Sequence, residues 1–249
     1  VHATAEEAQE ETMQMLGVYR DFCEKNLAIP VYCGQKSEKE KFAGARATYS
    51  IEAMMQDGKA LQSGTSHNFG TNFSEPFEIK YLDKDGTQKY AHETSWGTST
   101  RLIGAIIMTH GDERGLKLPP MIAPYQVVVV PVAAHKEGVL EGAKAVADKL
   151  TAAGLRVKFD DRDNVTPGWK FNEWELKGVP VRLAMGPRDL AGGTIELFRR
   201  DTLSKETVSQ EGLADRVEGL LDEIQANIYA KALRFRDSMI TRVDTYDEF

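Results

Sequence analysis

The pattern of hydrophobic and polar positions predicts a helix followed by hairpins in the first half of the chain. Apolar residues recur every three or four positions over 5–26, with acidic residues gathered at the N-terminal end of that stretch. This spacing predicts a helix that ends before Pro30, with its acidic end favourably placed in the helix dipole. A short extended segment is expected at 31–34, and a loop at 42–45.

Two hairpins are expected next. Strands at 46–55 and 59–67 flank Asp57-Gly58, which is a typical hairpin turn, and strands at 77–82 and 88–94 flank residues 84–86. Successive hairpins indicate an antiparallel sheet. The apolar run 100–110 predicts a buried helix.

The pattern changes near residues 120–125, where several prolines punctuate the chain. Strands and helices then alternate, which is typical of an α/β domain with a largely parallel sheet. We expect strands at 127–132, 156–160, 179–185 and 194–199, and helices at 137–153, 169–176 and 212–232. The predicted domains are 1–122 and 123–232, followed by a charged, partly helical tail at 233–249.

Composition excludes some classes of protein and leaves others open. The 249 residues are 41% hydrophobic and 28% charged, as in a soluble globular protein, and no apolar run has the length of a membrane helix. The net charge of −7 argues against nucleic-acid binding by the whole surface, but allows one local basic face. Cys23 and Cys33 are too few for a structural zinc site. We expect a cytoplasmic protein without a disulfide.

A single arginine follows a glycine-containing turn and begins an apolar segment. In the stretch from Ser95 to Gly104, Arg101 is the only charged residue. At the first turn of a helix, free N–H groups and the dipole favour an anion, and a guanidinium adds a bidentate donor for phosphate. Alternatively, Arg101 forms a structural ion pair with Asp112 or Glu113.

A second polar stretch runs from Gln62 to Gly70. In a strand, residues 63, 65 and 67 share a face, so Thr65 and His67 would project together, with Gln62 at the start of the strand. These groups form either the floor of a site for a small polar substrate or an ordinary solvent-facing strand. Ser95-Trp96-Gly97 would end the second hairpin, and Gly97 would let a ligand approach the backbone, or Trp96 would anchor a turn.

Taken in order, these segments resemble the prolyl-tRNA synthetase family across essentially the whole chain. This family belongs to the class II aminoacyl-tRNA synthetases. The resemblance rests on Gln-x-x-Thr-x-His at 62–67, Ser-Trp-Gly-x-x-x-Arg at 95–101, Gly-Leu-x-Leu-Pro-Pro at 115–120 and the segment 167–180. It implies a mixed fold of α/β and α+β type. The C-terminal half of an antiparallel catalytic domain would precede an α/β anticodon-binding domain.

The resemblance also implies roles. Gln62, Thr65 and Arg101 would bind ATP, with Arg101 on the phosphates as the catalytic residue. His67, Ser95, Trp96 and Gly97 would line the proline side. The implied reaction joins proline and ATP into prolyl-adenylate, with Mg²⁺ assisting, and then transfers the prolyl group to tRNA(Pro). No metal-ligating residues are assigned, and Glu93 has no assigned role.

In the second domain, the resemblance implies a tRNA anticodon site at Arg162, Lys170, Phe171 and Glu175. Cations, aromatic rings and a carboxylate are the groups that read single-stranded bases. Lys158, Lys177 and Arg182 would extend the basic face, with Asp161 and Trp174 in the same cluster. The alternative is a solvated loop in which one of the aromatic residues Trp169, Phe171 and Trp174 is buried in the core.

The chain is expected to be a fragment of such an enzyme. By the resemblance, motif 1, with its dimer interface, and the motif 2 arginine lie upstream of Val1, and a further C-terminal domain follows Phe249. The full-length enzyme would be a homodimer, and this chain alone would be inactive. The alternative is a non-catalytic, synthetase-like tRNA-binding module. A nucleotide-binding α/β protein of another class would not explain the hairpin-rich first half.

Overall fold

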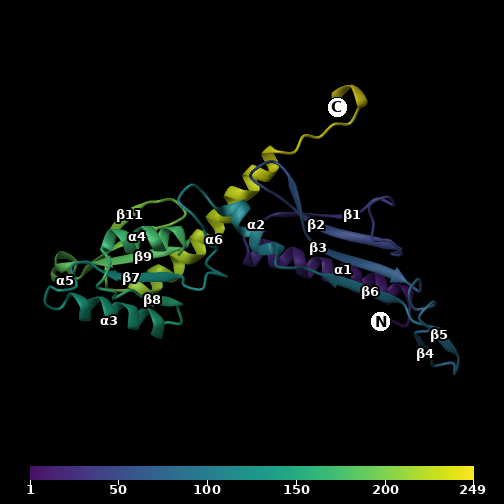
Figure 1. Ribbon diagram of the computed structural model, residues 1–249, viewed down its shortest axis with the longest axis horizontal. Coiled ribbons are helices and arrows are strands. Elements are labelled where there is room, and N and C mark those ends of the chain that lie inside the picture. Colours follow the sequence, from purple (N-terminus) through teal and green to yellow (C-terminus); the bar gives the residue numbers. More distant parts are fainter. The chain divides into compact units, whose positions relative to one another are not determined.

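The computed structural model describes residues 1–249, which form two compact units, each with its own β-sheet (Figure 1). The first unit comprises Val1–Thr109 and Phe235–Phe249, and the second comprises His110–Arg234. Antiparallel hairpins fill the first unit, and an α/β arrangement fills the second. The predicted mixed fold class is confirmed.

The first unit is a helix packed on a four-stranded antiparallel sheet. The helix α1 (Ala5–Asp21) continues into the π-helical turn η1 (Phe22–Asn26), so the predicted helix over 5–26 is confirmed. Thr4 caps its first turn by accepting a hydrogen bond from the Glu7 backbone N–H at 3.1 Å. The strands lie in the order β1 (Val31–Gln35), β2 (Ala47–Met54), β3 (Ala60–Gly70) and β6 (Glu93–Gly97).

One face of this sheet is covered by α1. The Ser66 hydroxyl donates to the backbone oxygen of Thr12 at 2.8 Å, and the Asn68 amide donates to Gln9 at 3.0 Å. Figure 1 shows α1 lying along β3 and β6. Because side chains alternate along a strand, the neighbours of Ser66 and Asn68 in β3 belong to the other face of the sheet.

A β-bulge changes this alternation at the start of β3. Ile51 pairs with Gly64, whereas Glu52 pairs with Gln62, so Ser63 is an extra residue in β3. Strict alternation would put Gln62 and Thr65 on opposite faces, and the bulge brings them to the same face. Ser63 itself pairs with no residue of β2. Ser63 is buried, and its hydroxyl donates to Leu61 O at 3.1 Å.

The second hairpin is shorter than predicted. Its strands β4 (Lys80–Leu82) and β5 (Gln88–Tyr90) form a separate two-stranded sheet. Residues 93–97 pair with β3 instead, so Ser95-Trp96-Gly97 belongs to the main sheet and does not end the hairpin. That pairing joins segments about 30 residues apart, which local pattern does not reveal.

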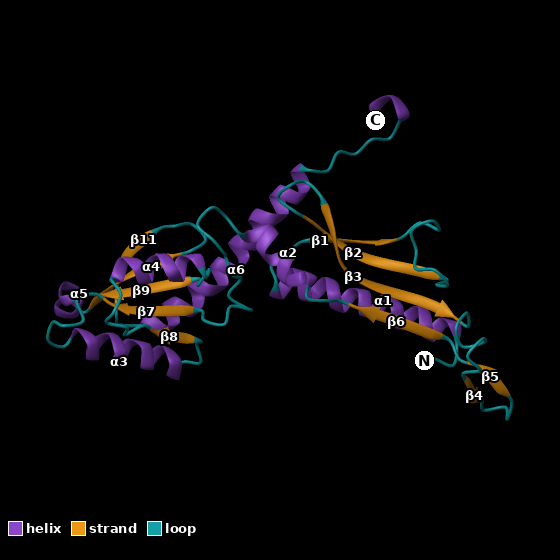
Figure 2. Cartoon of the chain, viewed as in Figure 1, coloured by secondary structure: helices purple, strands orange, loops and turns teal.

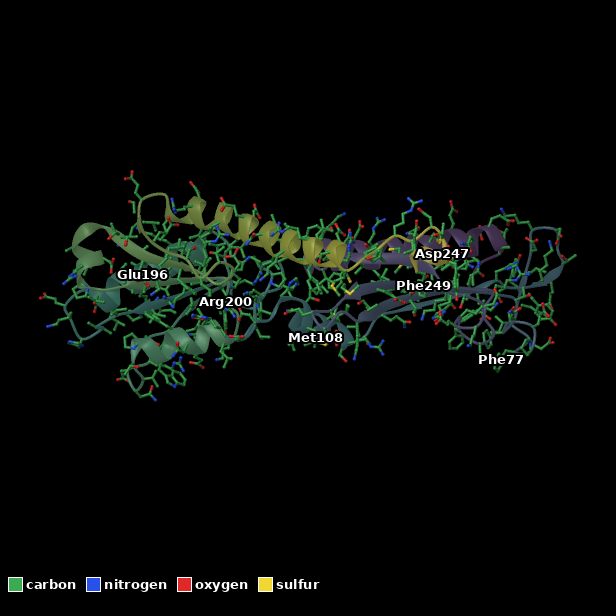
Figure 3. The ribbon with its side chains drawn as sticks, turned by 90° about the horizontal axis from the view of Figure 1, so that it is seen from above. Phe77, Met108, Glu196, Arg200, Asp247 and Phe249 are labelled. Atoms are coloured by element: carbon green, nitrogen blue, oxygen red, sulfur yellow. The ribbon has the colours of Figure 1, made fainter.

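The helix α2 (Arg101–His110) is only half-buried. Ala105 is fully covered, whereas Ile103 is 60% exposed, and Ile107 and Met108 are also exposed. Figure 3 labels Met108 on this helix. The prediction of a helix is confirmed, but the prediction that it is buried is wrong.

The second unit is a five-stranded mixed sheet in the order β11-β10-β9-β7-β8. β7 (Val127–Pro131) is parallel to β8 (Val157–Phe159) and to β9 (Val181–Met185). β10 (Thr194–Arg199) is antiparallel to β9 and to β11 (Lys205–Ser209). The predicted largely parallel sheet is therefore found only in the strands β9, β7 and β8. The helices are α3 (Val139–Ala152), α4 (Pro167–Leu176), α5 (Pro187–Gly192) and α6 (Leu213–Ser238), and the chain ends with the turn η2 (Tyr246–Glu248).

The helices α3 and α4 cover opposite faces of this sheet (Figure 2). Val128 and Val130 of β7 pack against Trp174 of α4, and the alternate residues Val127 and Val129 are fully buried on the other face. Burial of β7 on both faces explains its continuous run of valines.

The segment 112–118 packs entirely with the second unit. Leu116 N–H donates to Leu176 O at 2.9 Å, and Leu118 N–H donates to Gly178 O at 3.1 Å. Arg200, labelled in Figure 3, is 1% exposed and donates to both carboxylate oxygens of Asp112 at 3.0 and 2.5 Å. The units therefore divide at Thr109, earlier than the expected boundary near residue 122.

Candidate functional site

A pocket of about 300 Å³ lies on the first unit, on the sheet face opposite α1 and at the start of α2. It is lined by Gln62, Ser63, Gly64, Thr65, His67, Ser95, Trp96, Gly97, Thr98, Ser99 and Arg101. All seven residues predicted for the ATP and proline sites are among them. The structure therefore brings together residues that the sequence separates by up to 39 positions.

The strand register explains how they meet. His67 lies directly opposite Ser95, and Thr65 lies directly opposite Gly97, so these four residues share one face. Trp96 lies opposite Ser66, whose hydroxyl faces α1. The register thus places the Trp96 side chain on the α1 face, and Trp96 offers its backbone to the pocket. Trp96 still lines the pocket, and its place on the proline side stays a prediction.

Arg101 is the first residue of α2, as predicted, and its guanidinium is exposed. Its one side-chain hydrogen bond goes from Nη1 to the backbone oxygen of Gln62 at 3.2 Å, and the first turn of α2 contains no acidic residue. Asp112, the alternative ion-pair partner, is bound by Arg200 and Lys117. Arg101 therefore keeps most of its N–H donors for an anion.

His67 is held by a hydroxyl and two aromatic rings. Its Nδ1 lies 2.9 Å from Thr48 Oγ1, and its ring stacks on Phe69 and tilts against Phe42, with centroids 5.8 and 5.3 Å away. Burial, and then the positive charge of Lys36, lower the pKa of His67 below its usual value. His67 is therefore a neutral imidazole at neutral pH.

Two residues beside the pocket were missed by the sequence reasoning. Lys36 donates to the Gln62 side-chain oxygen, and Thr48 contacts His67 as described. Thr48, Ser50 and Glu52 alternate along β2 and pair with His67, Thr65 and Gln62 respectively. The polar alternation of 48, 50 and 52 was the available signal. Lys36 follows a short strand and carries no local signal of its position.

Glu93 lies on the pocket face of β6, two positions from Ser95. One of its carboxylate oxygens, Oε2, is buried without a hydrogen-bond partner in the structure. Glu93 therefore extends the row of polar groups at the end of the pocket face, although no role was assigned to it.

The residues predicted to read an anticodon are largely structural. Lys170 is 3% exposed and donates to the backbone oxygen of Asp160 at 3.0 Å, so it does not present a cation to solvent. Arg162 is bound by Asp160 and by Glu173, with its Nη2 2.7 and 2.5 Å from their oxygens. Lys170 is thus buried beside Asp160, whereas the Arg162 side chain keeps 39% exposure although it is ion-paired, and the anticodon role of both residues stays a prediction.

Phe171 and Glu175 are also engaged within the unit. The Arg182 guanidinium lies 3.7 Å from the Phe171 ring centroid, and Glu175 forms an ion pair with Arg114 at 2.9 Å. Trp174 is the buried aromatic residue expected in the core, and its Nε1 donates to Asp160 at 2.7 Å. Trp169 is 49% exposed, with the Arg162 guanidinium 5.2 Å from its ring centroid.

A second pocket of about 630 Å³ lies in the second unit. Its walls combine apolar and aromatic groups with three cations. They comprise Leu116, Leu118, Pro124, Tyr125, Lys158, Arg162, Glu173, Trp174, Lys177 and Val179. Tyr125 meets Trp174 edge to face, with centroids 6.0 Å apart.

The chain contains no group of three or more His, Cys, Asp or Glu side chains positioned to hold a metal ion. Cys23 and Cys33 are free thiols. None of the helices combines the length and apolar character required to cross a membrane.

Comparisons with known proteins agree with the resemblance that the sequence motifs indicated. Residues 126–220 match the anticodon binding domain family. The whole chain is 58% identical to a proline–tRNA ligase of Alkaliphilus oremlandii over 248 residues, which are 52% of that protein. The resemblance to the prolyl-tRNA synthetase family is confirmed.

Other relatives give the same result. The chain is 55% identical over 248 residues to proline–tRNA ligase 2 of Bacillus cereus, covering 52% of that protein. It is 57% identical over 251 residues to a proline–tRNA ligase of Parabacteroides distasonis, covering 51% of it. The chain thus spans about half the length of the curated prolyl-tRNA synthetase relatives it matches.

Proposed function

We propose that the full-length protein containing this chain ligates proline to tRNA(Pro) through prolyl-adenylate. The observation that carries the proposal is the pocket at the start of α2, where Arg101 and six other residues expected from the family meet on one sheet face. The relatives named above are proline–tRNA ligases. Such an enzyme would act in the cytoplasm, where tRNA is charged.

Arg101 and the start of α2 would bind the ATP phosphates. An exposed guanidinium without a carboxylate partner, at the positive end of a helix dipole, is a favourable environment for a phosphate. Gln62 is fixed by Lys36 through its side chain and by Arg101 through its backbone oxygen, so it would present its remaining amide N–H groups to the nucleotide. Thr65 lies beside it on the same face.

His67 and Ser95 would contact the proline end of the adenylate. They face each other across β3 and β6, and Gly97 leaves the backbone open beside Thr65. The enzyme needs no covalent nucleophile for this reaction. Positioning of the proline carboxylate against the α-phosphate, and stabilisation of the charge that develops there, would supply the catalysis.

Mg²⁺ would enter with the ATP phosphates. The chain lacks a group of three or more metal-ligating side chains, so its residues do not form a cage for the ion. Mg²⁺ at nucleotide sites is usually held by one or two carboxylates together with phosphate oxygens, and such an arrangement needs no dedicated cage.

Activity is proposed for the full-length protein, as a homodimer, and not for the 249-residue chain alone. Arg101 is the only formally charged residue among those lining the pocket. The Arg101 guanidinium, with Lys36 beside the pocket and bound to Gln62, carries less charge than a triphosphate, so we expect the rest of the protein to supply a further cation in addition to Mg²⁺.

The second unit would bind tRNA(Pro). Residues 126–220 match a family of anticodon binding domains. The exposed Trp169 and the pocket cations Lys158 and Lys177 replace the buried Lys170 as the groups available to bases and phosphates.

The test is proline-dependent exchange of pyrophosphate into ATP by the full-length protein. We expect exchange with proline and none above background with threonine or glycine. Absence of proline-dependent exchange, together with retained binding of tRNA(Pro), would favour the alternative of a non-catalytic tRNA-binding module. The 249-residue chain, assayed in parallel, is expected to show no exchange.

A further inference from the structure

The Thr48 side chain lies directly behind His67. Thr48 pairs with His67 in the register of β2 and β3, and it is 1% exposed. Its Oγ1 accepts a hydrogen bond from the Phe42 backbone N–H at 3.0 Å and lies 2.9 Å from His67 Nδ1. These are the two hydrogen bonds of its hydroxyl.

The hydroxyl has a single hydrogen, and this decides the direction of the second bond. Phe42 N–H must donate to Oγ1, because a backbone N–H has no acceptor capacity. If His67 Nδ1 also carried a hydrogen, the Thr48 hydroxyl would accept twice, and its own hydrogen would be buried without an acceptor. Buried donors without partners are unfavourable, so the hydroxyl donates to a bare Nδ1.

We propose that Thr48 is a positioning residue that keeps His67 in the neutral tautomer with its hydrogen on Nε2. Nε2 makes no hydrogen bond within the chain, and His67 lines the pocket, so this N–H is available to a ligand. The rings of Phe42 and Phe69 pack against the imidazole and against each other, which restrains its orientation. The tautomer therefore presents a fixed donor.

A fixed donor selects one end of an amino acid. The ammonium of an amino acid has only N–H donors, whereas its carboxylate has only acceptors. His67 Nε2–H would thus bind the carboxylate oxygen of the amino-acid substrate and would not accept from its ammonium. This second step rests on the proposed function, whereas the tautomer does not.

The tautomer is tested by NMR of the ¹⁵N-histidine-labelled 249-residue chain at neutral pH. We expect the two ring nitrogens of His67 to show a non-protonated Nδ1 and a protonated Nε2. Thr48→Val keeps the side-chain shape but removes the hydroxyl, and should give a mixture of tautomers. Thr48→Ser keeps the hydroxyl and should preserve the wild-type spectrum. A hydrogen on Nδ1 in the wild-type chain would overturn the proposal, whatever the variants do.

The contact with substrate is tested in the full-length protein. Thr48→Val should raise KM for proline in pyrophosphate exchange by about tenfold, with KM for ATP unchanged, and Thr48→Ser should restore it. Equal effects of Thr48→Val on both KM values would contradict the positioning role. An Nε2–H tautomer in a full-length protein without proline-dependent exchange would refute the proposed function and leave the tautomer standing.

Discussion

At the scale of single residues, the pocket of the first unit depends on a cation that has no carboxylate partner. Arg101 contacts only a backbone oxygen, whereas arginines of the second unit such as Arg162 and Arg200 are taken up by Asp or Glu. A cation left without a counter-ion next to a helix N-terminus is a favourable binding site for an anion.

We therefore predict that Arg101→Ala lowers kcat/KM for ATP in pyrophosphate exchange by about 10²-fold or more, because a bidentate donor to phosphate is lost. Arg101→Lys keeps the positive charge but loses the bidentate geometry, so its kcat/KM for ATP should lie between those of the wild type and Arg101→Ala. The variant should melt at the wild-type temperature, since Arg101 is exposed. A reduced melting temperature in parallel with the activity would indicate a structural role instead.

Asp160 is the residue that determines how the second unit responds to acid. Burial opposes its ionisation, but hydrogen bonds from Arg162 and Trp174 and the charge of Lys170 outweigh burial and lower its pKa to about 2. Because this pKa is below the value of about 3.9 in an unfolded chain, ionised Asp160 stabilises the fold above about pH 4. That contribution, on the order of 2 kcal/mol, is lost as the pH falls towards 2.

We expect the urea concentration at the unfolding midpoint of the second unit to decrease as the pH is lowered from 5 to about 2.5. Trp169 and Trp174 report it by fluorescence. Asp160→Asn should destabilise the unit by about 3–5 kcal/mol at pH 7, because it leaves buried Lys170 without its carboxylate, and should flatten the acid dependence. Asp161→Asn, at the exposed neighbouring position, is the control. Equal acid dependence in both variants would show that Asp160 is not the responsible group.

At the scale of elements, the end of α4 depends on one glycine. Gly178 has φ +74°, and a Cβ there would lie 2.7 Å from the backbone of Leu116. Gly178→Ala should destabilise the second unit by at least about 2 kcal/mol, from backbone strain and the clash with segment 112–118.

Gly168→Ala in the first turn of the same helix is the matched control. Nothing lies within 4 Å of a Cβ there, and alanine favours the helix, so no loss of stability is expected. Urea unfolding of both variants makes the comparison. Similar midpoints for the two would contradict the close approach of Leu116.

Helices and strands with a clear hydrophobic period were predictable from the sequence. Short or exposed elements without such a period were not. The helix over 5–26 and the buried strand of valines at 127–132 were found from their periods. β11 was missed because four of its five residues are exposed, so it has no hydrophobic alternation. The six-residue α5 is too short to show a helical period.

Within the site, residue types were predictable but their orientation was not. The polar groups from Gln62 to Arg101 were found from the motifs, yet the bulge at Ser63 and the side of Trp96 depend on strand register. Lys170 was expected to be exposed because lysine is rarely buried. Its burial depends on Asp160, ten positions earlier, as a partner.

At the scale of the whole molecule, the two units have separate sheets and cores, and the proposed tasks divide between them. Adenylate formation would use the pocket at α2, and tRNA recognition would use the surface around α4. Variants in one unit should therefore change one half-reaction and leave the other intact, provided that they do not unfold the unit.

Trp169 gives the sharpest test of this division. It is the exposed aromatic residue near the start of α4, and stacking of a base on an aromatic ring contributes about 1–3 kcal/mol. Trp169→Ala in the full-length protein should raise KM for tRNA(Pro) by about tenfold in aminoacylation and leave pyrophosphate exchange unchanged. Trp169→Phe keeps a ring, so its KM for tRNA(Pro) should lie close to that of the wild type.

Lys170→Ala should lower the melting temperature of the second unit, because the buried amine of Lys170 holds Asp160. If Lys170→Ala instead weakened tRNA binding in a protein of wild-type stability, and Trp169→Ala had no effect, the tRNA contact would have to involve Lys170 through a rearrangement of the Asp160 network.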